Sequence, residues 1–272
     1  MAILGTPNYL ATLNAHPRDE FITFEEGPHI YTVCGERGTY TSVTTWNHSH
    51  FSHFDADAVI DGMFASGNMD KPTYKYYGMT KEQIKEQWID SGRLASGSGT
   101  QMHADIEHYY NGMPIENDSL EFKYFLKFVN DHPDLTAYRT EWMVYYEELM
   151  ISGSIDMVFK NPDGTISIYD WKRSKEIDTE PKFGKYSHTE CISHLPDVNF
   201  WHYSLQLNVY RMILEKKYGM KVSKLVLVRI HPDDVYKTYE CLEVPFLDKE
   251  IADLTELRLK QVAEIKASKN LR

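Results

Sequence analysis

The chain has 272 residues, of which 42% are hydrophobic and 13% aromatic, so it can bury a sizeable core and is not a disordered chain. Lysine and arginine total 29 against 40 aspartate and glutamate residues, and the formal charge of −11 excludes a protein that coats nucleic acid over its whole surface. The three cysteines are too few and too far apart for a disulfide framework, a four-thiolate zinc site or a four-cysteine iron–sulfur cluster.

No targeting or membrane signal is visible in the sequence. No stretch approaches the roughly 18 consecutive apolar residues that a membrane span needs. The first twenty residues also lack the basic start of a signal peptide. We therefore expect a cytoplasmic protein that is not secreted and does not contact a membrane.

The N-terminal part of the chain is predicted to hold short strands followed by two helices. Residues 21–45 are rich in aromatic and β-branched side chains around a glycine-containing turn, which favours short strands. Apolar residues at helical spacing predict a helix over Thr80–Ser91, with Thr80 as its N-cap. The small residues after it predict a loop, and a second helix is expected from Gly99 or Thr100 to Gly112.

The rest of the chain alternates between strand and helix patterns. The predicted elements are a helix over residues 120–130, a strand meander from Arg139 to Lys172 that turns at residues 161–164, a helix over Asn199–Tyr218, strands over 224–230 and 236–244, and a helix over 248–266. The order α-β-β-β-α-β predicts an α/β fold with helices covering a sheet. We expect residues 1–80 to form an N-terminal extension whose short strands pack on or cap a core of residues 81–272.

Three charged residues stand on two neighbouring predicted strands. Asp156 lies in one strand, whereas Asp170 and Lys172 end the next and, being two residues apart, project from the same face. Carboxylates within reach of each other repel unless a cation lies between them, and Mg2+ prefers such oxygen ligands. The alternative is that the aspartates occupy turns and the lysine is a solvated charge. Both aspartates interrupt apolar strands, however, where an unpaired carboxylate is costly to bury.

Two predicted helices carry pairs of polar residues one turn apart. His103 and Glu107 share one face of the first helix, and Gln206 and Tyr210 share one face of the other. Each pair also has an ordinary explanation: Glu107 would be a solvated helix charge, and Gln206 and Tyr210 the polar rim of an apolar stripe. The pairs point to chemistry only in combination with the two aspartates and the lysine.

In chain order, the segments GTQMHADIE, GSIDMVF, YDWK and LQLNVY resemble the RecB-like branch of the PD-(D/E)XK nuclease superfamily. That family has a histidine on the first core helix, an aspartate in the second core strand, a D/E-x-K in the third strand and a Q-x-x-x-Y helix. The resemblance covers residues from about 95 to 230 and leaves the first eighty or so unexplained. It implies a restriction-endonuclease-like fold, with a central mixed sheet flanked by helices.

The resemblance also implies a metal-dependent catalytic site. The ligands of one or two Mg2+ or Mn2+ ions would be Asp156, Asp170, the carbonyl oxygen of Trp171 and His103. Lys172 would position the attacking water and help to deprotonate it. Glu107 is a further candidate ligand or the partner of a basic group, and Glu141, at the start of the first core strand, is a candidate for supporting the ligands. Gln206 and Tyr210 would contact the substrate and brace the active-site strands.

Two further places are candidates for contact with a phosphate. The loop of small residues and the helix start that follows it offer backbone N–H groups, with Arg93 and Thr100 beside them. A flexible connection is the alternative there. Arg173, Ser174 and Lys175 directly follow the lysine and add a local positive patch to an acidic protein.

The activity that the resemblance implies is that of a metal-dependent deoxyribonuclease. It would be an exonuclease that hydrolyses single-stranded or end-exposed DNA in replication, repair or recombination, at the nucleoid or at a viral replication site. A recombinase or a single-strand-binding protein would be its protein partner. Two alternatives stay open: a nucleic-acid-binding or interaction module that has kept the fold without catalysis, and an endonuclease specific for a site or a structure.

Overall fold

A computed structural model describes residues 2–181 and 184–270 of the chain. The helices are α1 (Tyr9–Leu13), α2 (Val43–His48), α3 (Ala56–Ala65), α4 (Lys81–Tyr110), α5 (Leu120–Asp131), α6 (Asn199–Lys217) and α7 (Asp248–Asn270), with short 3-10 helices η1 (Asp19–Phe21), η2 (Asn68–Asp70) and η3 (Glu190–Ile192). The strands are β1 (Ile22–Glu25), β2 (Ile30–Val33), β3 (Glu36–Arg37), β4 (Thr41–Ser42), β5 (Thr136–Tyr146), β6 (Ile151–Lys160), β7 (Ile166–Lys172), β8 (Val222–Arg229) and β9 (Glu240–Glu243). The chain divides into two compact units, one of residues up to Ser52 together with those from His103 onward, and one of residues His53–Met102.

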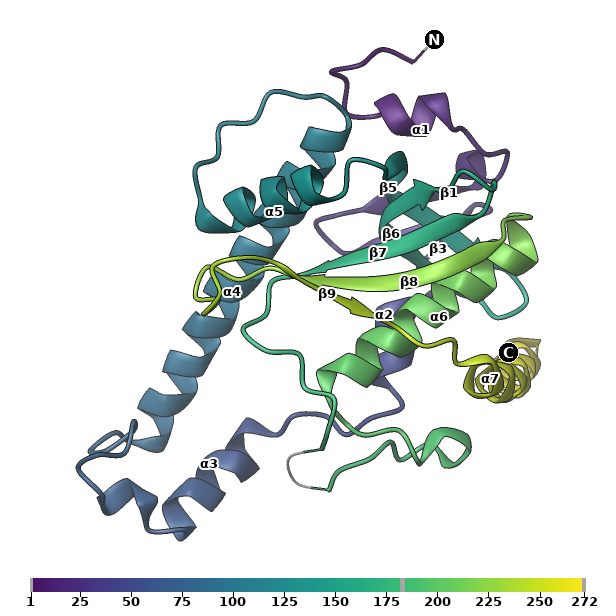
Figure 1. Cartoon of the computed structure of the whole chain (residues 1–272). Helices are drawn as coiled ribbons and strands as arrows, with labels where there is room; N and C mark the ends of the chain where they lie inside the picture. Colours follow the sequence, from purple (N-terminus) through teal and green to yellow (C-terminus); the bar gives the residue numbers. More distant parts are fainter. Residues whose placement is uncertain (1, 182–183, 271–272) are drawn as a thin grey trace. The chain divides into compact units, whose positions relative to one another are not determined.

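A six-stranded mixed sheet forms the centre of the first unit (Figure 1). β5, β6 and β7 are consecutive antiparallel strands, β8 pairs with β7 in parallel, and β9 lies antiparallel to β8 at the end of the sheet. The parallel pairing of β7 and β8 requires a crossover connection, which α6 provides. This is the predicted α-β-β-β-α-β order, and the fold is the expected mixed sheet flanked by helices.

Helices cover both faces of this sheet, α6 on one and α5 on the other (Figure 1). Ile168 of β7 belongs to the same buried cluster as the apolar stripe of α6. On the opposite face, the ring of Trp171 stands edge-on to the rings of Phe125 and Phe128 from α5, with centroids 5.6 and 5.3 Å away. Since side chains alternate along a strand, the neighbours of Trp171 in β7 face the α6 side.

The predicted ends of several elements are confirmed. Thr80 Oγ1 accepts a hydrogen bond from the N–H of Gln83 at 3.2 Å, and Gln83 Oε1 accepts one from the N–H of Thr80 at 2.8 Å. This reciprocal capping box satisfies N–H groups that would have no partner at the start of α4. Gly112 (φ 71°) and Gly219 (φ 64°) follow α4 and α6 in the left-handed conformation that ends many helices.

Residues near the N-terminus enter the central sheet, which differs from the predicted division of the chain. β1, β2 and β3 form a separate antiparallel sheet, but β4 pairs in parallel with the start of β6. The last of the short strands expected within residues 21–45, β4, is only two residues long, because Ser42 Oγ accepts the N–H of Thr45 and begins α2. The boundary expected at residue 80 falls inside the unit of His53–Met102.

The largest departure from the predicted elements is the continuous helix α4. The loop expected before Gly99 is helical throughout, so no helix begins at Gly99 or Thr100. Each glycine in this stretch disfavours a helix by roughly 1 kcal/mol, but no proline blocks the backbone hydrogen bonds and the residues at 93–95 are good helix formers. Residues 89–98 are exposed on every side of the helix, so local propensity and not packing decides their conformation.

The unit of His53–Met102 has a small core of its own. Four buried side chains form it, namely Ile60, Met69, Tyr76 and Ile84. Tyr76 Oη accepts a hydrogen bond from Trp88 Nε1 at 2.8 Å, which ties the segment before α4 to the first turns of that helix.

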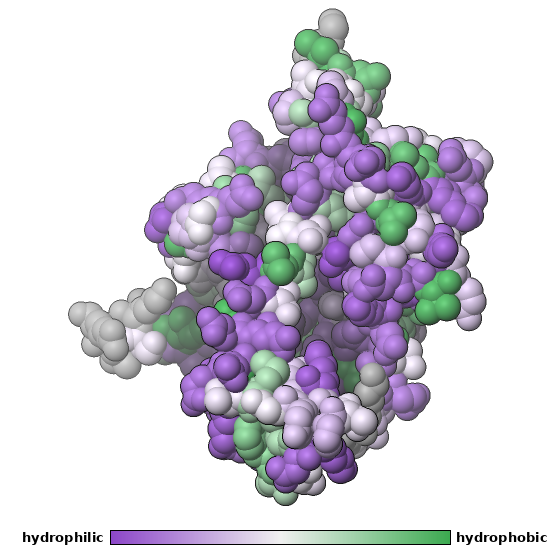
Figure 2. Space-filling view, turned by 90° about the vertical axis from the view of Figure 1, so that its left-hand side faces the viewer, coloured by the Kyte–Doolittle hydropathy of each residue, from purple (hydrophilic) through white to green (hydrophobic). Residues whose placement is uncertain are grey.

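The face of the molecule in Figure 2 is mostly hydrophilic, and its hydrophobic residues stand as separate spots. In the part of the chain that the structure describes, none of the helices has the length and apolar character needed to span a membrane.

Candidate active site

Strands β6 and β7 bring the two predicted aspartates together. The strands pair antiparallel, with Met157 opposite Tyr169. Asp156, just before Met157, therefore lies next to Asp170, just after Tyr169. The backbone N–H of Trp171 donates a hydrogen bond to Asp156 Oδ2 at 2.9 Å. The side chains of Asp156 and Asp170 are 11% and 2% exposed, so two carboxylates are placed side by side with little water around them.

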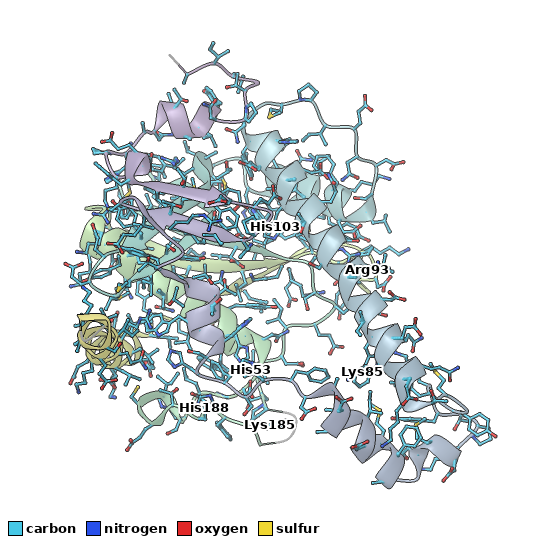
Figure 3. All side chains as sticks on the ribbon, turned by 180° about the vertical axis from the view of Figure 1, so that it is seen from behind. His53, Lys85, Arg93, His103, Lys185 and His188 are labelled. Carbon is cyan, nitrogen blue, oxygen red and sulfur yellow. The ribbon has the colours of Figure 1, made fainter. Side chains whose placement is uncertain are left out.

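His103 lies on the part of α4 that belongs to the first unit, beside these strands (Figure 3). Its Nδ1 is 3.5 Å from Asp156 Oδ2 and 3.6 Å from Glu141 Oε1, and its Nε2 is 3.0 Å from the carbonyl oxygen of Trp171. Within residues 2–181 and 184–270, the one group of three potential metal ligands with all ligand atoms within 4.8 Å of one another is His103, Glu141 and Asp156. The structure therefore brings together three of the predicted ligands, His103, Asp156 and the Trp171 carbonyl.

Glu141 is held in this group by an unusual backbone. Its φ angle of 41° is left-handed in the middle of β5, a conformation that costs a residue other than glycine about 1–3 kcal/mol and persists only where its surroundings enforce it. Ser154 Oγ donates a hydrogen bond to Glu141 Oε2 at 2.9 Å. The sequence predicts Glu141 only as a support for the ligands, because neither strand alternation nor residue spacing reveals a left-handed backbone.

The charges of these groups are coupled. Burial raises the pKa of Asp156, and burial together with Asp156 raises the pKa of Asp170 to about 6. Burial lowers the pKa of His103, but Asp156 and Glu141 outweigh that effect and raise it to about 9. The negative charges of the carboxylates thus favour the protonated form of the His103 imidazole. Such a centre favours a cation.

Lys172 ends β7 on the same face as Asp170, as the strand spacing predicted. Its Nζ is 2.7 Å from Asp170 Oδ2 and 4.4 Å from the centre of the Tyr203 ring on α6. Burial lowers the pKa of the ammonium group, but attraction by Asp170 and Asp156 outweighs burial and raises it. Lys172 therefore carries its positive charge at the edge of the carboxylate cluster.

Tyr210 lies beneath β6 and not at the surface. It is 2% exposed, and burial raises its pKa well above the usual range, with Tyr31 and Asp156 adding to the effect. Gln206, one turn earlier on α6, hydrogen-bonds its hydroxyl. The predicted bracing of the strands agrees with this position, whereas the predicted contact of Tyr210 with substrate does not, because a buried side chain has no access to it.

Glu107 lies one turn after His103, as predicted, but outside the compact ligand group. It lines a cavity of about 170 Å³ together with Glu141, Arg139 and the N-terminal Pro7. Burial and the neighbouring charge of Glu141 raise the pKa of Glu107 to about 7. Its assignment as a metal ligand stays a prediction.

The four predicted phosphate contacts have partners within the protein. Arg173 forms an ion pair with Glu121 at 2.8 Å, and Ser174 donates to a backbone carbonyl two residues ahead. Arg93 is exposed and pairs with an aspartate one turn earlier, and the Thr100 hydroxyl donates to a carbonyl of its own helix. The prediction of a helix N-terminus that binds a phosphate beside Arg93 and Thr100 is wrong, because α4 is continuous through these residues.

The cluster fits a hard divalent cation by the chemistry of its donors. Carboxylate oxygens, a carbonyl oxygen and an imidazole nitrogen are ligands that Mg2+ or Mn2+ accepts. Asp170 Oδ2 is buried and makes its ion pair with Lys172 without the geometry of a hydrogen bond, so this oxygen still has the capacity to bind a cation.

The family model of the PD-(D/E)XK nuclease superfamily matches residues 121–270, more than half of the chain. Among curated proteins no relative matches. The solved structures similar to this chain include a "Putative exonuclease" from Eubacterium rectale, with 12% identity, 85% of this chain and 82% of that chain covered, and a TM-score of 0.34. They also include an alkaline exonuclease from Laribacter hongkongensis, with 13% identity, coverage of 82% and 92%, and a TM-score of 0.34.

Proposed function

This chain belongs to the PD-(D/E)XK nuclease superfamily, and from that premise we propose that it is a metal-dependent deoxyribonuclease that acts as an exonuclease on single-stranded or end-exposed DNA. The observation that carries the proposal is the partly buried group of His103, Glu141 and Asp156. The buried Asp170 lies on the neighbouring strand, with Lys172 beside it. The proposed setting is replication, repair or recombination in the cytoplasm, with a recombinase or a single-strand-binding protein as partner.

The residues that would hold Mg2+ or Mn2+ are His103, Asp156, Asp170 and the carbonyl of Trp171. We add Glu141 to this set, because its carboxylate lies within 4.8 Å of the ligand atoms of His103 and Asp156. A bound divalent ion supplies positive charge beside the scissile phosphate and favours deprotonation of the attacking water. The chain's own contribution is to hold several carboxylates together against their mutual repulsion, through the pairing of β6 with β7 and through the Trp171 N–H bond to Asp156.

Lys172 is the proposed catalytic lysine. Its ammonium group is tethered beside Asp170 by a 2.7 Å ion pair, where it can orient a water and stabilise the extra negative charge of the transition state. A non-catalytic binding module would gain nothing from this arrangement, because clustered carboxylates repel the phosphates of nucleic acid.

The test is degradation of single-stranded DNA labelled at its 5′ or 3′ end, with Mg2+, Mn2+ or EDTA. The matched pair of variants is Lys172→Ala and Lys224→Ala, since Lys224 is on β8 of the same sheet but is exposed and pairs with Glu243. We expect metal-dependent degradation that Lys172→Ala loses by about a hundredfold or more and Lys224→Ala retains. The label released first gives the polarity.

The same assay separates the alternatives. Cleavage of circular single-stranded DNA, which has no ends, would replace the exonuclease with an endonuclease. If the folded wild-type protein cleaves no single strand, duplex end or RNA with either metal but still binds DNA, the binding module is the better description.

A further inference from the structure

Tyr203 is a residue of the site that no family motif singles out. It lies in the first turns of α6, three residues before Gln206, and its ring centre is 4.4 Å from Lys172 Nζ. The ammonium group thus has two partners on different elements, the Tyr203 ring on α6 and the Asp170 carboxylate on β7.

A divalent cation bound at the site would change the attraction of Lys172 to Asp170 but not its attraction to the Tyr203 ring. Asp170 is a candidate metal ligand, and a carboxylate that shares its charge with a divalent cation attracts a neighbouring ammonium group less strongly. The face of an aromatic ring attracts a cation through its quadrupole, which does not depend on the charge of the carboxylate. The attraction is strongest where water is excluded, and the Lys172 side chain is 17% exposed.

The position of the ring is itself fixed relative to Lys172. Asn199, the first residue of α6, accepts the N–H of Asp178 at 2.8 Å and donates to the carbonyl of Glu176 at 3.0 Å. Trp201 Nε1 donates to the carbonyl of Thr179 at 3.0 Å. The start of α6 is therefore tied to the segment that directly follows β7, and the ring and the ammonium group belong to one connected piece of structure.

We propose that Tyr203 is the positioning residue of Lys172: the Tyr203 ring keeps the Lys172 ammonium group in place when Asp170 binds the metal. This inference rests on the proposed nuclease function. The ring and not the hydroxyl makes the contact, so phenylalanine should replace tyrosine but an aliphatic side chain should not.

The kinetic test compares wild type, Tyr203→Phe, Tyr203→Leu and a matched control. Tyr146 is that control, because its ring lies 4.4 Å from Lys217 Nζ in the same kind of contact outside the site. We expect kcat to fall about tenfold in Tyr203→Leu with KM little changed, and to stay within about twofold of wild type in Tyr203→Phe and Tyr146→Leu. Equal losses in Tyr203→Phe and Tyr203→Leu, or none in Tyr203→Leu, would overturn the inference.

A second readout does not depend on activity. The Lys172 methylene next to the ammonium group lies near the face of the Tyr203 ring, so its NMR signal should be shifted upfield. The signal is assigned to Lys172 by its absence from the spectrum of Lys172→Arg. We expect this shift in EDTA and equally after addition of MgCl2, in wild type and Tyr203→Phe, and its loss in Tyr203→Leu or, where that variant does not fold, in Tyr203→Gln. Loss of the shift in wild type on adding MgCl2 contradicts the inference. Failure of the proposed nuclease function can be distinguished from failure of this inference, because in the first case the wild-type protein itself would not cleave DNA.

Discussion

The ring of Tyr210 lies directly against the backbone of Gly153: a Cβ atom at residue 153 would stand 2.8 Å from both Cε1 and Oη of Tyr210. Gly153 is in β6, three residues before Asp156, and Tyr210 is in α6. Because Gly153 has no side chain, α6 can pack directly against the strand that carries Asp156, a proposed catalytic carboxylate.

Replacing Gly153 by alanine forces the strand and the helix apart. Overpacking of this kind costs typically about 1–3 kcal/mol, and the displacement of β6 should lower activity as well. Urea unfolding measures the loss of stability. Gly27→Ala is the matched control, because a Cβ there meets nothing within 4 Å and the expected change is small.

A double-mutant cycle identifies the contact responsible. If the Tyr210 ring causes the clash, Gly153→Ala should cost clearly less stability in a Tyr210→Leu background than in wild type. Additive losses in the double variant would show that Gly153 is needed for another reason.

Replacing Glu141 by glutamine should weaken metal binding. The change removes one negative charge from the group that His103 and Asp156 complete, and the expected loss of Mn2+ affinity, measured by calorimetry, is about tenfold or more. Ser154→Ala, which removes only the hydrogen bond to Glu141, should have a smaller effect. Glu243→Gln, on β9 of the same sheet, should have none. Unchanged Mn2+ affinity in Glu141→Gln would exclude Glu141 from the metal site.

Much of the site follows from local pattern. Asp170 and Lys172 share a face because strand side chains alternate, and the Phe125 stripe of α5 faces the sheet because helical spacing gathers it on one side. The pairing of two successive strands likewise places Asp156 beside Asp170. These parts of the prediction depend on interactions between residues close in the chain. The grouping of His103, Gln206 and Tyr210 with them comes from the family resemblance, because His103 meets Trp171 across 68 residues.

The parts that could not be predicted depend on contacts between distant residues or on weak preferences. The left-handed backbone of Glu141 and the fit of Tyr210 over Gly153 are set by tertiary packing, which no local pattern records. The helix α4 continues through Gly97 because several small helix propensities add up in its favour. The run of serine and glycine residues in the sequence favours a loop instead. The place of β4 in the central sheet is a pairing with Ile151, more than a hundred residues away.

His50 should make the protein less stable in weak acid. Burial, with the charges of His188 and Arg258, lowers its pKa from 6.5 to about 4, and its Nε2 is buried without a hydrogen-bond partner in the described residues. A histidine that is harder to protonate when folded stabilises the protein fully above the unfolded pKa, and that stability is lost as pH falls from about 6.5 toward 4. The loss should approach about 3 kcal/mol.

Unfolding by urea at a series of pH values checks this expectation. His50→Gln should remove most of the fall in stability between pH 6.5 and 4, whereas His53→Gln, at an exposed position, should keep it. An equally steep fall in His50→Gln would assign the pH dependence to other groups.

The exposed stretch of α4 should become more stable when its glycines are replaced. Gly97 is helical, does not have a positive φ, and a Cβ there meets nothing within 4 Å. Alanine should therefore stabilise the helix by roughly 1 kcal/mol and slow amide hydrogen exchange of residues 89–101 about fivefold. Gly164→Ala provides the contrast, because φ is 85° at that turn and the same replacement should destabilise it. If exchange in Gly97→Ala is unchanged or faster, this stretch is the loop that its serine and glycine content suggests, and α4 in solution is two helices.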